Sequence, residues 1–297
     1  MYIARVDMGI LQALRRFVMS WTGTVVLVLL AIFFVAQAFV IPSRSMVGTL
    51  YEGDMLFVKK FSYGIPIPRL PWLDIPLLPD FKGNGHLFEG KRPERGEVVV
   101  FIPPSNKGYY VKRLFAVGGD EVVFNQEGFY LHPVESEKDP KYIATHFPNH
   151  PTKQFLGKDF VFAPYADKHL GIFYSKNNQT FNIMEAIYAH QILNLPGISM
   201  QLVDHDGENI FYVKVEKDHF FMIGDNRDDS GDSRFWGSVP YSHIVGTPWF
   251  VYFSLNLTNS IEAGKGSKNI FTVRWKRMFK TLAGLESQLE KRHVQED

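Results

Sequence analysis

Two serines and one lysine are the side chains of this sequence that could support nucleophilic catalysis. Ser43 and Ser45 stand two residues apart in the stretch IPSRSM (41–46), directly after a long apolar run. A serine hydroxyl is a weak nucleophile unless a neighbouring base takes its proton, and a neutral lysine can serve as that base in place of histidine. The two serines could form an ordinary turn, or one of them could be a nucleophile.

Lys112 is the candidate base because it stands inside an apolar stretch, YYVKRLFAV (109–117). In a strand, alternation places it on one face with Tyr110, Leu114 and Ala116. Burial there would lower its pKa from about 10.4, at which only about one lysine in a thousand is neutral near pH 7.5. A head group that reaches back to water is the alternative, and the pattern does not choose between them.

The polar stretch GDNRDDSGDSRFWG (224–237) is the third candidate for chemistry. It could be a solvated loop, or a scaffold that pairs arginine with aspartate and orients a base. A calcium loop fails here, because the bidentate glutamate that it needs would fall at Gly237. The sequence contains no H-E-x-x-H pair and no G-K-[ST] or G-x-G-x-x-G motif, which removes the usual zinc, phosphate and dinucleotide sites.

Charge balance and the absence of cysteine limit the classes of function. The chain has 297 residues with 32 basic and 31 acidic side chains, so it lacks the basic excess of a nucleic-acid-binding protein. Its hydrophobic content of 45% is enough for one large or two modest cores. Without cysteine it holds neither a disulfide nor a thiolate metal site, while an exported location remains open.

The apolar run that precedes the serines predicts a membrane anchor at 21–41. It contains no charged residue, and a helix of its length spans roughly 30 Å, the thickness of a bilayer core. Arg15 and Arg16 precede it, which places residues 1–20 in the cytoplasm and the remainder outside, in a single-pass protein. The alternative is a secretory signal with its A-x-A site at 36–38, cleaved after Ala38.

The elements that must position these side chains read mainly as short strands. We expect strands at 53–58, 97–101, 109–117, 220–223 and 247–253, a hairpin-type turn at 118–120, and one helix at 183–193. Such a pattern is typical of a mainly β protein.

Two further segments leave alternatives open. The proline-rich stretch 65–92 predicts loops or edge ribbons, in which Trp72, Leu77 and Leu78 could enter a membrane interface or pack on the protein's own sheet. The tail from Phe271 has an amphipathic helical pattern with basic neighbours. That helix could dock on the body or lie on a membrane surface.

In its ordered motifs the sequence resembles the bacterial type I signal peptidases, membrane-anchored serine endopeptidases that remove signal peptides. The resemblance rests on five blocks that follow the anchor in order: IPSRSMVGTL (41–50), GDMLFVKKFSYG (53–64), RGEVVVF (95–101), YYVKRLFAVGGD (109–120) and GDNRDDSGDSRFWG (224–237). Each block alone is weak evidence. Their shared order makes the resemblance specific.

The resemblance implies a role for each site residue. Ser45 would be the nucleophile, Lys112 the general base, and Ser43 an oxyanion-hole donor beside the backbone N–H of Ser45. Ser230 would orient the lysine ammonium. The structural supports of the site would be Arg113, Asp232 and Arg234. Shallow apolar pockets for the A-x-A residues would be formed by Phe39, Ile41, Met46, Leu50, Leu56, Val100, Tyr110 and Val111.

The resemblance also implies an architecture and a location. A β-rich catalytic core (42–120 and 219–255) would carry an inserted variable domain at 121–218, and 256–297 would form a C-terminal tail. The enzyme would need no metal and no cofactor. Its partners would be the signal peptides of secreted preproteins and the lipid bilayer, near the Sec or Tat export machinery, with the catalytic domain on the outer face of a bacterial cytoplasmic membrane.

Two departures from the family pattern are visible. The nucleophile block usually reads S-M-x-P-T-L, and Gly48 stands here in place of the proline, which predicts a looser turn after Ser45. Many Gram-negative members carry two membrane segments, whereas one is expected here. The rival functions are a specialised peptidase for one pilus or conjugation substrate, a self-cleaving Ser-Lys repressor, which the anchor disfavours, and a tethered β-domain that only binds peptides.

Overall fold

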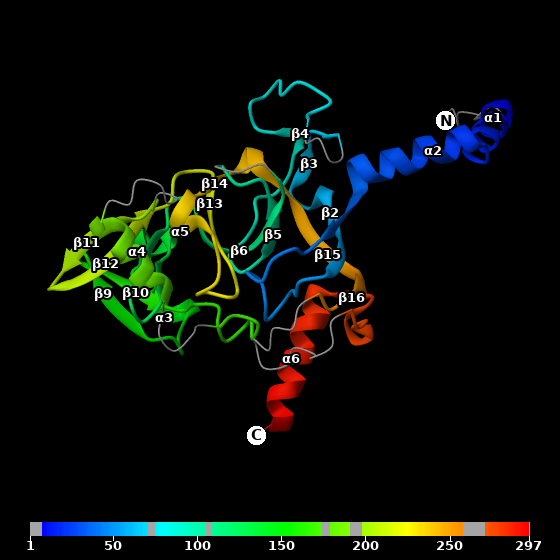
Figure 1. The fold of residues 1–297 in the computed structure, drawn as a ribbon. Helices are drawn as coiled ribbons and strands as arrows, with labels where there is room; N and C mark the ends of the chain where they lie inside the picture. Colours follow the sequence, from blue (N-terminus) through cyan, green and yellow to red (C-terminus); the bar gives the residue numbers. More distant parts are fainter. Residues whose placement is uncertain are drawn as a thin grey trace.

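Strands make up most of the molecule. The computed structural model describes residues 8–70, 75–104, 108–173, 179–190, 198–257 and 271–296. These residues fold into two large sheets and a small ribbon, with helices near both ends of the chain (Figure 1). The mainly β class predicted from the sequence is confirmed.

The larger sheet carries the candidate catalytic residues, and its neighbouring strands are antiparallel. Its order is β1 (Ala36–Val40), β2 (Asp54–Lys59), β15 (Ile244–Ser254), β5 (Val98–Phe101), β6 (Tyr110–Val117), β13 (His219–Ile223) and β14 (Val239–Pro240), with β16 (Lys280–Thr281) paired to β15. The five expected strands correspond to β2, β5, β6, β13 and β15. Their alternating or continuous apolar patterns made them visible in the sequence.

The smaller sheet has six strands and lies within the predicted insertion. Its order is β11 (Gln201–His205), β12 (Glu208–Lys214), β7 (Glu121–Phe124), β8 (Phe129–His132), β10 (Lys158–Phe162) and β9 (Thr152–Phe155). Helix α4 (Gln179–His190) starts earlier than the helix expected at 183–193, and residues 191–193 lie outside the described residues. Its Phe181 and Met184 join the apolar core of this sheet.

The hairpin predicted at 118–120 is not formed, because this turn joins strands of two different sheets. Strand β6 pairs with β13, whereas β7 pairs with β8 and β12. The buried carboxylate of Asp120 accepts hydrogen bonds from the backbone N–H groups of Val117 and Val134 and is paired with Arg95 at 2.6 Å. This carboxylate holds the chain as it passes from one sheet into the other.

The two sheets share one apolar core. Phe115 and Phe221, from the larger sheet, pack in the same cluster as Phe124, Phe129 and Phe211 of the smaller sheet. A second cluster under the candidate site contains residues of β2, β5, β15 and the C-terminal helix. The division into separate domains at 121 and 218 therefore stays a prediction.

The helix expected over 21–41 is shorter than predicted. Helix α2 (Trp21–Leu30) continues as a π-helical turn, η1 (Ala31–Val35), and the chain then becomes strand β1 because Ala36–Val40 pairs in register with β2. No single helix of the described chain is long and apolar enough to cross a membrane. The helices Leu11–Val18 and Trp21–Val35 pass that test together, with a bend of 82° between them. The first of the two belongs to α1 (Met8–Val18).

The C-terminal helix also begins later than its sequence pattern suggests. Residues from Phe271 pass through a 3-10 turn, η6 (Trp275–Arg277), and strand β16 before helix α6 (Leu282–Glu296) starts. Phe271 and Phe279 adopt positive φ angles of 62° and 58°, which interrupt a helix. Leu285 of α6 is buried in the core beneath the site, so the helix docks on the body.

The proline-rich segment forms a short ribbon, as predicted, from β3 (Gly64–Pro66) and β4 (His86–Glu89). Leu77 and Leu78 are each 43% exposed, whereas Trp72 lies outside the described residues. The remaining short helices are η2 (Lys60–Ser62), η3 (Val134–Glu137), α3 (Tyr142–His146), α5 (Ser233–Trp236) and η4 (Tyr241–His243).

Candidate active site

Ser45 and Lys112 are in contact although 67 positions separate them in the sequence. Ser45 lies in the turn after β1, and Lys112 lies in the middle of β6. Lys112 Nζ donates a hydrogen bond to Ser45 Oγ, and the two residues are only 3% and 7% exposed. Ser43 Oγ lies 3.3 Å from Ser45 Oγ. A buried hydroxyl nucleophile and a buried amine base therefore meet, and the exposed residue Ser43 brings a second hydroxyl beside them.

The turn that carries Ser45 is tightly held. Val47 N donates to Arg44 O at 2.9 Å, and Leu50 N donates to Met46 O at 2.8 Å. Gly48 has a φ of +110°, and a Cβ at this position would lie 2.1 Å from Gly171 O. Proline cannot adopt that φ angle, and any side chain would collide with the backbone of residue 171. Gly48 thus allows the close approach to residue 171, while the looser turn predicted from the missing proline stays a prediction.

Burial makes the Lys112 amine a usable base. Loss of solvation lowers the pKa of Lys112 to about 8, although the nearby negative charge of Asp232 favours the ammonium. At pH 7.5 about a quarter of such lysines are neutral, compared with about one in a thousand at the ordinary value. Lys112 is thus buried on the apolar strand face, as one of the two alternatives predicted, and this burial lowers its pKa. Its head group does not reach back to water.

The polar stretch 224–237 is a buried scaffold rather than a solvated loop. The Asp232 carboxylate accepts two hydrogen bonds from the Arg234 guanidinium, both at 2.8 Å, and both side chains are fully buried. Burial opposes ionisation of Asp232, but Arg234 outweighs it and holds the pKa of this carboxyl below its ordinary value. The pair places two opposite charges near Lys112: the Asp232 carboxylate favours the ammonium, and the Arg234 guanidinium disfavours it.

Gly224 allows this scaffold to approach the nucleophile. A Cβ on Gly224 would lie 2.4 Å from both Ser45 O and Ser230 Oγ, so only glycine fits between them. Asn226 N donates to Ser45 O at 3.1 Å. Ser230 thus lies beside the nucleophile turn, where its hydroxyl helps to lower the pKa of the Asp232 carboxyl, and no hydrogen bond from it to Lys112 is seen among the described residues. Its role in orienting Lys112 stays a prediction.

A second ion cluster, centred on Arg113, joins three elements behind the dyad. The Arg113 guanidinium donates to both oxygens of Asp225, at 2.7 and 2.8 Å, and to Glu286 of α6 at 2.8 Å. Thr49 Oγ1 donates to Asp225 at 2.6 Å. Burial disfavours the Asp225 carboxylate, yet the charge of Arg113 keeps its pKa below the ordinary value. The cluster fixes the nucleophile turn, the base strand and α6 relative to one another.

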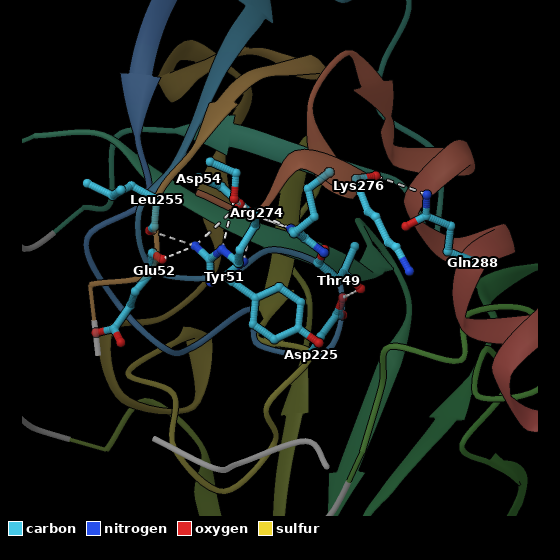
Figure 2. A network of polar contacts seen from close by, with 11 residues as sticks. Thr49, Tyr51, Glu52, Asp54, Asp225, Leu255, Arg274, Lys276 and Gln288 are labelled. Carbon is cyan, nitrogen blue, oxygen red and sulfur yellow. Dashed lines mark hydrogen bonds and ion pairs between the residues drawn. The ribbon is translucent and has the colours of Figure 1, made fainter. Parts of the chain in front are cut away.

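Figure 2 shows a third network, in which the C-terminal segment (residues 271–281) is hydrogen-bonded to the loop that follows the nucleophile turn (residues 49–54). The buried carboxylate of Asp54 accepts from Arg277 at 2.6 Å, from Ser254 at 2.6 Å and from the backbone N–H of Tyr51 at 2.8 Å. Arg277 also donates to Thr49 O at 2.8 Å. Arg274 donates to the backbone carbonyls of Glu52 and Leu255. Two arginines of the C-terminal segment thus fix the loop between Ser45 and β2 in place.

An apolar cavity of about 500 Å³ opens onto the dyad. Of the predicted pocket residues, five line it: Phe39, Ile41, Met46, Tyr110 and Val111. Three others are fully buried in the core and do not line the cavity: Leu50, Leu56 and Val100. Because these three pack in the same cluster as Ile41 and Met46, they support the cavity wall from behind.

Several residues that build the site were missed in the sequence. The cavity lining also includes Val40, Pro42, Arg44, Glu52, Tyr109, Asp229 and Gly231. Behind the dyad, the missed residues are Thr49, Asp54, Asp225, Arg274, Arg277 and Glu286. Asp54 and Asp225 each follow a glycine at the start of one of the family-like blocks, and this shared Gly-Asp pattern could have marked them as site residues. Arg277 offered none, since its partner Asp54 is 223 positions away.

Comparison with known proteins gives a consistent result. The family model described as "Signal peptidase, peptidase S26" matches residues 14–253. A signal peptidase I of Helicobacter pylori is 62% identical over 290 residues, which cover 97% of this chain and 99% of that protein. The signal peptidase I of Rickettsia typhi is 29% identical over 241 residues, 80% of each chain.

Among solved structures, the crystal structure of a signal peptidase I from Enterococcus faecalis matches 53% of this chain and 97% of that chain. The sequence identity is 23% and the TM-score is 0.25. The family assignment rests on the sequence comparisons, which extend from the N-terminal helices to strand β15. On this evidence the chain belongs to the S26 signal peptidase family of serine peptidases.

Proposed function

We propose that this protein is a membrane-bound endopeptidase that removes N-terminal signal peptides from exported preproteins at A-x-A sites. The observation that carries the proposal is the buried contact between Lys112 Nζ and Ser45 Oγ at the end of an apolar cavity. Membership of the signal peptidase family and the names of its relatives support the choice of substrate.

In the proposed acylation step, neutral Lys112 accepts the proton of the Ser45 hydroxyl as Oγ attacks the scissile carbonyl carbon. The carbonyl π electrons move onto oxygen, and the oxyanion accepts hydrogen bonds from Ser43 Oγ and the backbone N–H of Ser45. When the tetrahedral intermediate collapses, the C–N bond breaks and the Lys112 ammonium donates its proton to the leaving amine. The signal peptide remains as an ester on Ser45.

Deacylation repeats the sequence with water. Lys112, neutral again, accepts a proton from a water molecule that attacks the ester carbon. Collapse breaks the C–Oγ bond, and the ammonium returns its proton to Ser45. A single amine thus serves both half-reactions, which requires it to be neutral before each attack and charged after it.

The lining of the cavity supports the proposed preference for uncharged side chains. Phe39, Ile41, Met46, Tyr110 and Val111 line it beside the dyad. An alanine side chain would bury its methyl group there favourably, whereas a charged side chain would lose its hydration against this apolar lining.

We further propose that α2 and η1 cross a bacterial cytoplasmic membrane once, with the N-terminus in the cytoplasm and the dyad on the outer face. Together they extend for only about 22 Å, so this crossing requires the bilayer, about 30 Å thick in its core, to thin around them. Arg15 and Arg16 before α2 support this orientation. The π-helical turn ends at Val35, and Ser45 follows ten residues later, after strand β1. The site would thus meet a signal peptide just outside the bilayer, near the Sec or Tat machinery that delivers it.

The test is processing of an A-x-A preprotein by the full chain in detergent or vesicles. Ser45→Ala and Lys112→Ala should each reduce cleavage by at least about a thousandfold, because each removes one half of the dyad. Exposed Ser287→Ala and Lys168→Ala serve as matched controls and should cleave normally. Substantial cleavage by either dyad variant, with circular dichroism showing a folded protein, would overturn the mechanism.

Two rival functions are separated by simple additions to that assay. A domain that only binds peptides would not be labelled at Ser45 by a covalent serine-reactive probe. A peptidase specialised for one pilus or conjugation substrate would fail on several unrelated preproteins. Labelling of Ser45 together with broad processing would support the general signal peptidase.

A further inference from the structure

Helix α1 (Met8–Val18) has a role that the proposed catalytic function does not require. We propose that α1 is an interfacial helix that lies on the membrane and binds its anionic phospholipid headgroups. This rests on the membrane insertion of α2 proposed above and goes beyond the peptidase activity. Figure 1 shows α1 at the end of α2 that is far from both sheets, so α1 does not support the dyad directly.

The side chains of α1 divide into two faces. At about 100° per residue, Leu11, Leu14, Phe17 and Val18 fall within an arc of about 120°. Gln12 and Arg16 lie on the opposite side, and Arg15 borders the apolar arc, about 40° from Leu11. Leu11 is 53% and Leu14 is 58% exposed, so no described residue covers the apolar face. A helix with this division and low overall hydrophobicity is suited to the boundary between headgroups and acyl chains.

The 82° bend between α1 and α2 is built into the sequence at two residues. Ser20 Oγ accepts from Gly23 N at 3.0 Å and caps the start of α2, while Ser20 N and Oγ both donate to Phe17 O, at 3.0 and 2.6 Å. A Cβ at Gly23 would lie 1.7 Å from Phe17 O. Only glycine therefore allows the carbonyl end of α1 to rest against α2.

The bend between α1 and α2 favours a lipid surface as the binding partner of the apolar face of α1. If α2 crosses the bilayer near its normal, a helix turned by 82° lies almost in the membrane plane. The apolar arc can then face the acyl chains, while the guanidinium groups reach phosphates. Residues 8–18 contain two arginines and no acidic residue, which complements anionic headgroups. A second copy of the same basic helix would meet repulsion between like charges.

The absence of cysteine in the chain makes site-directed spin labelling the suitable test. Single variants Leu14→Cys and Gln12→Cys report the two faces of α1, and Leu27→Cys reports the span. The full chain is placed in phosphatidylcholine vesicles with or without phosphatidylglycerol. With phosphatidylglycerol, the label at 14 should lie at headgroup depth and the label at 12 in water.

Replacing both arginines, Arg15→Gln with Arg16→Gln, should lower the bound fraction of α1 relative to the free fraction by on the order of 25-fold. A label at 14 that stays in water while the label at 27 is deep would overturn the proposal. So would a depth at 14 that depends neither on phosphatidylglycerol nor on the arginines, since the apolar face alone would then hold α1 in the membrane without anionic headgroups. A shallow label at 27 would instead overturn the membrane insertion of α2.

A second pair of variants tests the bend. Gly23→Ala places a methyl group on Phe17 O, so the distance between labels at 14 and 27 should lengthen and label 14 should leave headgroup depth. Gly9→Ala is the matched control, because a Cβ there meets nothing within 4 Å. An unchanged distance in Gly23→Ala would show that α1 does not depend on this bend.

Discussion

At the scale of single residues, the protonation state of Lys112 controls the proposed chemistry. Burial lowers the pKa of Lys112 to about 8, and only the neutral amine can accept the Ser45 proton. We therefore predict that kcat/KM rises with pH, about tenfold per pH unit below 8, and levels off above it. The measurement is kcat/KM for a short A-x-A peptide between pH 6 and pH 10.

Lys60 offers a control for this pH profile. It is also buried, and burial lowers its pKa to about 8, but its Nζ donates to Phe33 O at 3.4 Å, and no hydrogen bond joins it to Ser45 or Lys112 in the described chain. Lys60→Met should retain the rise in kcat/KM near pH 8. A profile that is flat from pH 7 to pH 9, or one that Lys60→Met abolishes, contradicts the assignment of the base to Lys112.

At the scale of elements, the C-terminal segment acts as a brace for the nucleophile turn. Arg277 neutralises buried Asp54 and donates to Thr49 O, and its guanidinium carbon lies 4.3 Å from the centroid of the Tyr51 ring. We predict that Arg277→Ala lowers the free energy of unfolding by ~3 kcal/mol, because it removes the nearer ion-pair partner of buried Asp54, at 2.6 Å, and leaves Arg274 at 3.6 Å. Urea denaturation measures this change.

The same variant should also affect activity. Well below its unfolding midpoint, Arg277→Ala should lose several-fold in kcat/KM, since the turn that positions Ser45 would be less well fixed. Lys276→Ala is the matched control, because the Lys276 side chain is exposed and only its carbonyl is bonded, to Gln288. If Arg277→Ala and Lys276→Ala have equal stability and equal activity, Arg277 does not stabilise the nucleophile turn.

These elements also explain what the sequence could and could not predict. The strands β5 and β6 were predictable, because their apolar patterns are local. The end of the N-terminal helix at Val35 was not, since the apolar composition of Ala36–Val40 suits a helix as well as a strand and only pairing with β2 decides. The salt bridge between Arg277 and Asp54 likewise depends on a tertiary contact that no local pattern records.

At the scale of the whole molecule, the insertion is part of the support of the site. Phe173 N donates to Asp225 O at 3.0 Å, and Arg227 N donates to Phe173 O at 3.2 Å, so this segment runs beside the scaffold stretch. The resemblance predicted a variable domain at 121–218 and left its role open. Its contact with the site was not predictable, because it depends on two glycines from distant segments, Gly48 and Gly171, that meet backbone to backbone.

Gly171 therefore tests whether the insertion helps to position the dyad. A Cβ at Gly171 would lie 2.1 Å from Thr49 Oγ1, the hydroxyl that donates to Asp225, so Gly171→Ala must displace the nucleophile turn. We predict a loss of about tenfold or more in kcat/KM with the secondary structure retained. Gly284→Ala in α6 is the control, because its Cβ would meet nothing closer than 3.4 Å. Full activity of Gly171→Ala would mean that the turn is positioned by the larger sheet and the C-terminal brace alone.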